Sequence, residues 1–446
     1  MLRVAVVGSG PSGVYTAQAL VQQQAVPGVR VDVLDRLPCP YGLVRYGVAP
    51  DHEKIKSLQN NLREALEHPD VTFLGNVRVG EGLHPKRLLD LYHAVVYCVG
   101  AAADRRLGIP GEDLPGSFSA TEFVSWYSAH PDAAPGGFVL GARSAVVIGV
   151  GNVAVDVARV LARGAEELRP TDVPDAALAA LADSRVTDIH IVGRRGPAQA
   201  KFTTKELREL GALPGAQALV SQEEAALDPA WADPSGLPGA VRRNVEVLQD
   251  WAAQPPRTCG RRIRMRFFLR PVALLGDGAV RAVRFERTAP DGHGGVRGTG
   301  QFEEIEAQLV LRSVGYRGVP IAGLPFDGER GTVPNDRGRV LREGVPSPGE
   351  YVAGWIKRGP TGVIGTNRSC AKETVASLLA DAEALGARKL PPDPLEALRG
   401  AGQEPVQWPG WLGIEAAEAA LGRRLGRGTV KIPDWNGLLT AARRTG

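Results

Sequence analysis

Two glycine-rich segments, each directly after a short apolar run, constrain this chain more than any other feature of its sequence. The first is Gly8-Ser9-Gly10-Pro11-Ser12-Gly13, after the apolar residues 4–7, and the second is Gly149-Val150-Gly151-Asn152-Val153-Ala154, after residues 145–148. In a strand-to-helix turn, such glycines let the backbone approach a pyrophosphate, and the helix N-terminus faces its negative charge. The sequence therefore predicts two phosphate-binding turns in a chain that can hold two dinucleotides at once.

The residues that follow each turn predict a strand–helix–strand unit, which is stronger evidence than the glycines alone. After the first turn we expect a helix over about residues 13–23 and a strand over residues 31–34. After the second turn we expect a helix over about residues 152–163 and a strand over residues 188–192. Uninterrupted apolar runs of this kind are typical of parallel strands buried on both faces. The expected fold is therefore α/β, with two Rossmann-like dinucleotide-binding domains.

The two units differ in the residues at the end of their second strand. The first ends at Asp35, and a carboxylate at this place normally accepts the hydroxyl groups of a ribose. The second ends at Arg194 and Arg195, where an acid would repel a 2′-phosphate but paired guanidinium groups can bind it. The second site is therefore predicted to prefer NADP(H). A structural ion pair is the alternative interpretation of these two arginines.

Similar strand–glycine junctions at residues 94–100 and 309–315 indicate where the chain passes between its domains. The NADP domain is then an insertion in a discontinuous FAD domain. Within it, residues 228–262 are rich in Pro, Gly and Trp, and we expect an irregular excursion there. The predicted ranges are residues 1–103 for the first part of the FAD domain, 104–315 for the NADP domain, and 316–446 for the second part with a C-terminal extension.

Composition and charge narrow the function classes. The 446 residues include 53 Lys and Arg against 49 Asp and Glu, a net charge of +4 that is too small to indicate nucleic-acid binding. No apolar run approaches the roughly 18 residues of a membrane span, and the first strand starts almost at Met1, so we expect a cytoplasmic protein without a membrane anchor. The four scattered cysteines form neither a ferredoxin-type cluster motif nor a redox-active pair, and we expect no metal centre.

Several further motifs resemble the adrenodoxin reductase-like family of ferredoxin–NADP reductases, including its bacterial members. Two of them, within residues 41–52 and 354–367, are far more specific than the glycine turns. The others lie in the family's order through most of the chain, at residues 8–13, 75–80, 149–159, 193–197 and 202–209. The resemblance implies a flavoenzyme with a glutathione reductase-like arrangement of its domains. It also implies the reaction: NADPH delivers a hydride to FAD, which then reduces a ferredoxin-type iron–sulfur protein one electron at a time.

The resemblance also implies which residues bind each cofactor. Asp35 replaces the glutamate that the family commonly has, and Trp355 stands where many such flavoproteins have an aspartate, so that its ring can pack on the flavin. The residues expected to line FAD are Gly8, Gly10, Ser12, Gly13, Asp35, Leu43, Val79, Trp355, Gly362, Val363 and Ile364. Those expected to line NADP(H) are Val150, Gly151, Asn152, Val153, Arg194, Arg195, Glu206 and Gly362.

Two more sets of residues follow from the resemblance. His52 and Glu209 correspond to a polar pair near the flavin, where a histidine beside a carboxylate can relay the proton taken up with the hydride. Arg208, Arg242 and Arg243 are candidates for docking an acidic ferredoxin. For each of these five residues, an ordinary exposed position is the alternative.

Three other functions fit two dinucleotide sites. A flavin monooxygenase would consume NADPH in proportion to a small organic substrate. An electron-input subunit of a larger oxidoreductase would usually carry an N-terminal cysteine-rich segment, which does not precede Gly8 here. A nucleotide-binding redox sensor would bind both dinucleotides but show negligible turnover with any electron acceptor.

Overall fold

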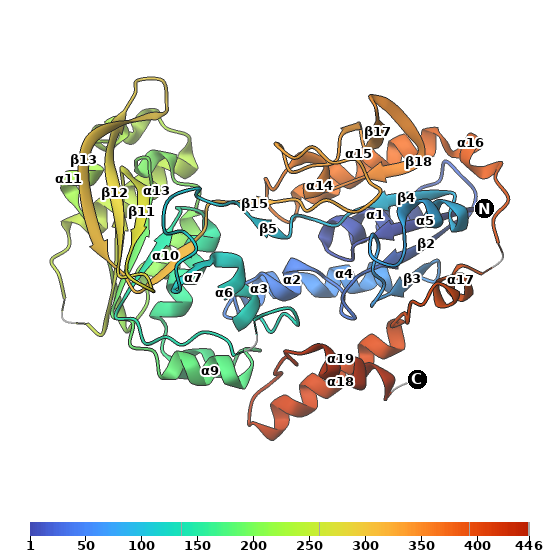
Figure 1. The fold of residues 1–446 in the computed structure, drawn as a ribbon, viewed down its shortest axis with the longest axis horizontal. Coiled ribbons are helices and arrows are strands. Elements are labelled where there is room, and N and C mark those ends of the chain that lie inside the picture. Colours follow the sequence, from blue (N-terminus) through green and yellow to red (C-terminus); the bar gives the residue numbers. More distant parts are fainter. Residues whose placement is uncertain (135, 258, 392, 445–446) are drawn as a thin grey trace. The chain divides into compact units, whose positions relative to one another are not determined.

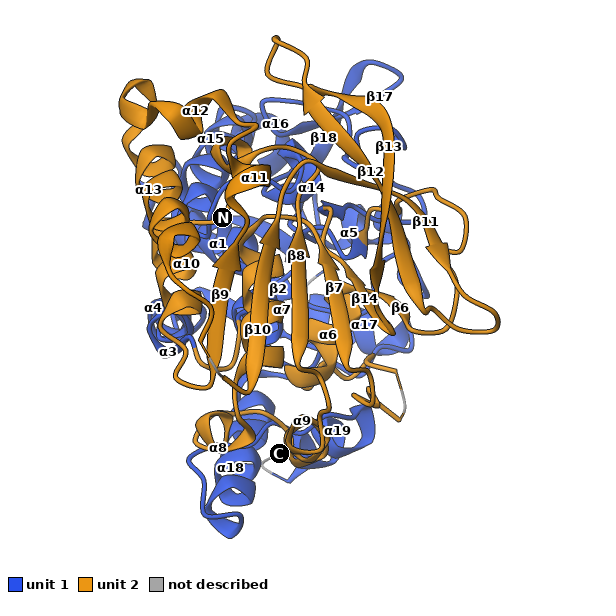
Figure 2. Cartoon of the chain, turned by 90° about the vertical axis from the view of Figure 1, so that its left-hand side faces the viewer, with its two compact units in different colours: residues 1–48, 52–103, 315–446 blue, residues 49–51, 104–314 orange. Residues whose placement is uncertain are grey.

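The structure is a computed structural model that describes residues 1–134, 136–257, 259–391 and 393–444. The chain divides into two compact units, coloured separately in Figure 2. The first comprises Met1–Val48, His52–Ala103 and the chain from Gly315 onward, and the second comprises Ala49–Asp51 and Asp104–Val314. The residues 49–51, which the sequence places in the first unit, therefore make their contacts in the second. The short strands β5 (Ala103–Asp104) and β15 (Tyr316–Arg317) lie at the two passages of the chain.

The first unit is built on a seven-stranded sheet with the strand order β16-β17-β18-β4-β1-β2-β3 (Figure 1). The strands β18, β4, β1, β2 and β3 run parallel, and β16 and β17 are antiparallel additions at one edge. The strands are β1 (Leu2–Val7), β2 (Val29–Leu34), β3 (Val71–Leu74), β4 (Ala94–Tyr97), β16 (Asn335–Asp336), β17 (Arg339–Arg342) and β18 (Val345–Val352).

Helices cover both faces of this sheet because consecutive side chains of β1 belong to different cores. Val4 and Val6 pack with α1, α4 and α15, whereas Ala5 and Val7 pack with α5 and α17. The helices of the unit are α1 (Pro11–Gln22), α2 (Leu43–Tyr46), α3 (Glu53–Lys56), α4 (Leu58–Leu66), α5 (Pro85–Leu91), α14 (Trp355–Arg358), α15 (Thr366–Ala380), α16 (Ala382–Gly386), α17 (Pro394–Gly400), α18 (Trp408–Arg424) and α19 (Trp435–Arg443).

The second unit contains a six-stranded parallel sheet in the order β6-β14-β7-β8-β10-β9, whose strands Figure 2 shows side by side. Helices pack on one face, and a three-stranded antiparallel sheet, β11-β12-β13, packs on the other. The strands are β6 (Ser117–Ser119), β7 (Ser144–Ile148), β8 (Asp188–Val192), β9 (Ala216–Val220), β10 (Arg261–Arg266), β11 (Leu269–Leu275), β12 (Ala282–Pro290), β13 (Val296–Glu306) and β14 (Leu309–Arg312).

The helices of the second unit correct one expectation. Residues 228–262 are not an irregular excursion, because a fifteen-residue helix, α13 (Gly239–Ala253), buries Val245, Leu248 and Trp251 against the sheet. Its approach is irregular, with two single turns that each begin at a proline. The other helices are α6 (Ala120–Tyr127), α7 (Asn152–Ala162), α8 (Ala165–Leu168), α9 (Asp175–Ala182), η1 (Pro197–Gln199), α10 (Thr204–Gly211), α11 (Gln222–Ala225), α12 (Pro229–Ala232) and η2 (Pro234–Gly236).

The predicted strand–helix–strand units are both present, and their ends differ by one or two residues. The first helix begins at Pro11 rather than Gly13, because proline fits the first turn of a helix, where its missing N–H has no partner to lose. No helix among the described residues is both long and apolar enough to cross a membrane.

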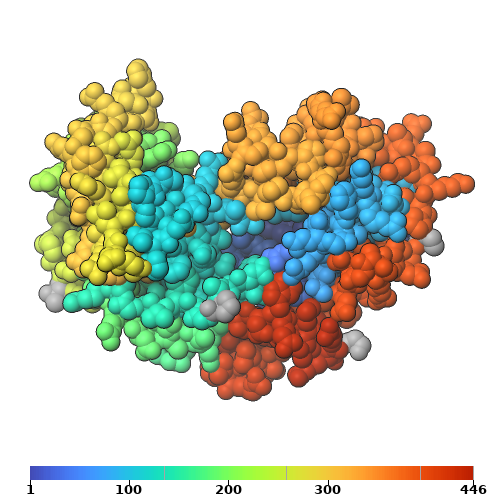
Figure 3. All heavy atoms as spheres, in the orientation of Figure 1, coloured from blue at the N-terminus to red at the C-terminus, as the bar shows by residue number. Residues whose placement is uncertain are grey.

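The C-terminal helices α18 and α19 are fastened to the first unit by a buried ion pair. Arg45 donates to Glu418 Oε1 over 2.6 Å, and both side chains are almost completely buried. The Arg45 guanidinium also lies over the ring of Trp411, and Lys431 Nζ donates to the Arg45 carbonyl over 2.6 Å. The C-terminal residues, red in Figure 3, thereby form part of the surface of this unit.

We expect Glu418→Ala to destabilise the first unit by about 3–5 kcal/mol, because it leaves the Arg45 charge buried and unpaired. The free energy of unfolding, from urea titration followed by tryptophan fluorescence, measures this effect. Glu404→Ala is the matched control, since it breaks the exposed pair with Arg443 and should cost about 1 kcal/mol or less. Equal effects of the two variants would contradict the structural role of the buried pair.

A second prediction concerns His190, in the middle of β8. Burial, followed by the positive charges of Arg266 and Arg264, lowers the pKa of His190 to about 4, although Asp188 opposes the shift. The unfolded chain binds this proton at an ordinary pKa near 6.5, so stability is lost as the pH falls from about 6.5 to 4. We expect His190→Gln to lose about 2 kcal/mol less than the natural chain between pH 7 and pH 5. The exposed His293→Gln is the control, and an unchanged pH dependence in the His190 variant would contradict the prediction.

Candidate functional site

The first glycine turn connects β1 to α1 and leaves the N-terminus of α1 open. A Cβ at Gly13 would lie 1.8 Å from the Gly8 carbonyl oxygen, and a Cβ at Gly8 would lie 2.5 Å from that of Cys98. Only glycine fits these two positions. Gly10 differs, since its Cβ would meet nothing closer than the Gly42 Cα, at 3.8 Å. The turn is thus closed toward the sheet but can be approached at Gly10, as binding of a pyrophosphate requires.

The Asp35 carboxylate is part of this turn. Its Oδ2 accepts the Ser9 N–H over 2.7 Å and the Ser9 hydroxyl over 2.5 Å, and its Oδ1 accepts the Leu37 N–H over 2.9 Å. Burial raises the pKa of Asp35, and these hydrogen bonds oppose the rise. Asp35 thus supports the glycine turn, a role that was not predicted from the sequence. A carboxylate has about four lone-pair sites, so one remains for a ribose hydroxyl.

The structure gathers predicted FAD residues from both parts of the first unit. Ser12, buried in α1, lies against the segment after β18, because a Cβ at Gly354 would lie 2.4 Å from the Ser12 Oγ. Trp355 begins α14 there, donates from Nε1 to the Thr361 carbonyl over 3.2 Å, and packs tilted against Tyr316.

The remaining predicted FAD residues lie in the loops of the same unit. Leu43 is the first residue of α2 and is 40% exposed. Val79 is partly buried in the loop after β3. Gly362 has the positive φ of +81° that suits glycine in a tight loop, and Val363 after it is exposed while Ile364 is partly buried.

The second glycine turn connects β7 to α7 and is joined to the loop after β8. A Cβ at Gly149 would lie 2.1 Å from the Ser313 carbonyl oxygen, whereas a Cβ at Gly151 would meet nothing within 4 Å. The Val150 carbonyl accepts the Lys201 N–H, and the Asn152 side chain accepts the Thr203 N–H, each over 2.8 Å. Val153 continues the first turn of α7 and packs at the edge of its core.

Arg194 and Arg195 follow β8 with their side chains unengaged. The Arg194 carbonyl accepts the Thr288 hydroxyl over 2.8 Å, and the Arg195 carbonyl accepts the Phe268 N–H over 3.2 Å. Neither guanidinium forms an ion pair with any acid in the described ranges. Arg194 is exposed and Arg195 is partly buried. The alternative of a structural ion pair therefore lacks a partner, and both cations are available to a ligand.

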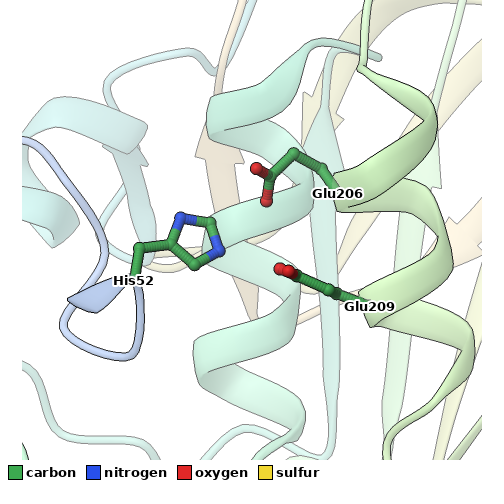
Figure 4. Close-up of side chains that lie close together, drawn as sticks. All are labelled: His52, Glu206 and Glu209. Carbon is green, nitrogen blue, oxygen red and sulfur yellow. The ribbon is translucent and has the colours of Figure 1, made fainter. Parts of the chain in front are cut away.

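A buried arginine organises the acids around α10. Glu206 and Glu209 project from α10 one turn apart, as Figure 4 shows. Arg159, fully buried on α7, donates to Asp51 Oδ2 over 2.7 Å and to Glu206 Oε2 over 3.2 Å. It also lies 2.9 Å from Asp156 and 4.0 Å from Glu209. Burial disfavours its charge, but the hydrogen bond with Asp51 and the surrounding carboxylates hold the pKa of Arg159 above its usual value.

His52 lies in the first unit, and the predicted docking arginines lie in the second. His52 is buried at the N-terminus of α3, in the first unit, directly after Asp51 in the chain. In the second unit, Arg208 on α10 and Arg242 and Arg243 on α13 are exposed, and these two helices pack together. Arg159 and Asp51 were not predicted as site residues, although they lie within the family motifs at residues 149–159 and 41–52.

Comparison with known proteins agrees with this architecture. Residues 2–209 match the family described as pyridine nucleotide-disulphide oxidoreductase. NADPH-ferredoxin reductase FprA of Mycobacterium tuberculosis is 44% identical over 445 residues, 96% of each chain. The mitochondrial NADPH:adrenodoxin oxidoreductase of Arabidopsis thaliana is 39% identical over 99% of this chain and 95% of its own.

A solved structure shows the same fold over the full length. FprA of M. tuberculosis in complex with NADPH superimposes with a TM-score of 0.93 at 44% identity, covering 99% of each chain. Two independent comparisons, of sequence and of structure, thus agree over nearly the whole chain. The chain belongs to the adrenodoxin reductase and FprA-like family of NADPH–ferredoxin reductases.

Proposed function

We propose that this chain is a ferredoxin–NADP(+) reductase that binds FAD in its first unit and NADP(H) in its second. In this reaction electrons pass from NADPH through FAD to an acidic ferredoxin-type iron–sulfur protein. One observation supports the proposal most directly: two glycine turns have open helix N-termini, one beside Asp35 and one beside Arg194 and Arg195, which form no ion pair within the described part of the chain. If the chain bound a single dinucleotide, one of these two turns would have no pyrophosphate to bind.

The first unit fits FAD through the backbone of its glycine turn. The N–H groups at the start of α1 face a pyrophosphate next to Gly10, and Asp35 both fixes Ser9 and accepts a ribose hydroxyl. Leu43, Val79, Trp355 and the loop 362–364 supply apolar surface and backbone groups for the rest of the cofactor. When bound, FAD supplies a ring that accepts two electrons together and returns them singly.

The second unit fits NADP(H) through the same kind of glycine turn, but it has arginines in place of an aspartate near the expected ribose. Residues 150–153 present the open turn at Gly151 and the N-terminus of α7 to the pyrophosphate. Arg194 and Arg195 offer forked donors to the 2′-phosphate. Glu206, and Gly362 of the first unit, are also proposed to line NADP(H).

His52 and Glu209 are proposed as the proton-handling pair, with His52 able to hold or release a proton at a ring nitrogen. The Arg159 cluster supports this role, because it binds Asp51, the neighbour of His52, and Glu206, one turn from Glu209. The buried Arg159 cation holds Asp51 and Glu206 in place by hydrogen bonds. Arg208, Arg242 and Arg243 are proposed to attract the acidic ferredoxin, since exposed charges accelerate encounter rather than tighten binding.

The proposed function is tested by following cytochrome c reduction from NADPH with the yellow purified protein. We expect the rate to rise strongly when an acidic ferredoxin is added, and to fall as salt screens the docking arginines. NADPH oxidation that depends on a small organic substrate instead would support a monooxygenase. Binding of both dinucleotides without turnover would support a sensor, and a colourless protein without flavin would end the proposal.

The cofactor preference is tested by the double variant Arg194→Ala and Arg195→Ala. We expect its KM for NADPH to rise about tenfold to a hundredfold, because charge-assisted hydrogen bonds worth about 1.5–3 kcal/mol are lost, with little change in the KM for NADH. Arg262→Ala is the matched control, since this exposed arginine of the same unit is already paired with Asp188. An unchanged ratio of the two KM values would remove the NADP assignment.

A further inference from the structure

The loop that carries Arg194 and Arg195 is anchored by hydrogen bonds of its backbone groups. Its first residue, Gly193, exchanges hydrogen bonds with strand residues on both sides, donating to the Arg266 carbonyl over 2.9 Å and accepting the Leu269 N–H over 3.0 Å. The two arginine side chains contribute no ion pair among the described residues. Thr288 and Phe268 hold the carbonyls of Arg194 and Arg195 directly, and the contact at the far end of this loop is the third restraint on where the two guanidinium groups lie.

Asp228 fixes that far end. This residue, 2% exposed, precedes α12, and its Oδ2 accepts the Ala198 N–H over 2.9 Å while its Oδ1 accepts the Ala230 N–H over 3.0 Å. One carboxylate thus joins two separate segments of the chain. Ala198 lies within the η1 turn at residues 197–199, three residues after Arg195.

Gly196 allows the carboxylate to come this close. A Cβ at Gly196 would lie 2.4 Å from Asp228 Oδ2 and 2.6 Å from the ring of Phe268. Its φ of −79° is ordinary, so glycine is needed here for space and not for backbone conformation. The loop therefore packs directly on Asp228, one residue after Arg195.

We propose that Asp228 is a positioning residue that sets the preference for NADP(H) over NAD(H), which rests on the NADP site proposed above. A guanidinium group binds a phosphate with two parallel hydrogen bonds only when its backbone is held in place. Asp228 supplies this hold from outside the coenzyme site. Its effect falls on the 2′-phosphate that distinguishes the two coenzymes, and the pyrophosphate turn at Gly149 and Gly151 stays intact.

The test uses Asp228→Asn and, as an independent change of the same contact, Gly196→Ala. An asparagine still caps α12, but its amide can accept only one of the two N–H groups well. We expect the KM for NADPH to rise about tenfold in each variant, the loss of one charge-assisted hydrogen bond, with kcat and the KM for NADH changed less than twofold. Calorimetry with 2′,5′-ADP and 5′-AMP should show the same selective loss without turnover.

Asp233→Asn is the matched control, because this exposed aspartate caps the next turn of the same segment through the Ser235 N–H. Equal losses for NADPH and NADH would show a merely structural role and overturn the inference. Unchanged selectivity in both variants, with selectivity lost in the arginine double variant, would overturn it and leave the NADP site standing. Unchanged selectivity in the arginine double variant would overturn the NADP assignment and the inference together.

Discussion

In both units a glycine Cα packs directly against a backbone carbonyl of the neighbouring strand, and the geometry of each site depends on this contact. Gly8 meets the Cys98 carbonyl after β4, and Gly149 meets the Ser313 carbonyl after β14. Each glycine ends a strand, β1 or β7, whose two sheet neighbours are reached by connections on opposite sides, which is where open α/β sheets bind ligands. A side chain there would separate the strands and move the helix N-terminus that faces the ligand.

In each unit a buried arginine joins segments that are distant in the sequence. Arg45 binds Glu418 in the first unit, and Arg159 binds Asp51 and Glu206 in the second. A guanidinium with its carboxylates removed would be an uncompensated charge in the interior, so these contacts form together or not at all. The segments they fix, residues 42–45 and the start of α10, carry residues proposed to bind the cofactors.

Local sequence predicted the elements, and long-range contacts decided what it missed. The apolar runs before Gly8 and Gly149, and the helix and strand patterns after each glycine turn, correctly predicted the two strand–helix–strand units, because strand and helix signals are local. The helix α13 was missed because Pro and Gly residues before it masked an amphipathic pattern that only the packed sheet makes visible. The role of Asp35 at Ser9 was missed because its partner lies 26 residues away.

The ends of β2 and β8 show how one turn geometry can serve two coenzymes. At the end of β2, two of the turn's own donors occupy one oxygen of the Asp35 carboxylate, so the acid is rigid and short, and it repels added phosphate. At the end of β8 the backbone bonds are made by Thr288, Phe268 and Asp228, none of which uses the arginine side chains. In the first unit one residue, Asp35, both supports the turn and is proposed to bind the ribose. In the second unit these two roles belong to different residues. In the proposed NADP(H) site, this separation leaves both guanidinium groups available to a phosphate, because among the described residues neither is engaged in an ion pair that the ligand would have to break.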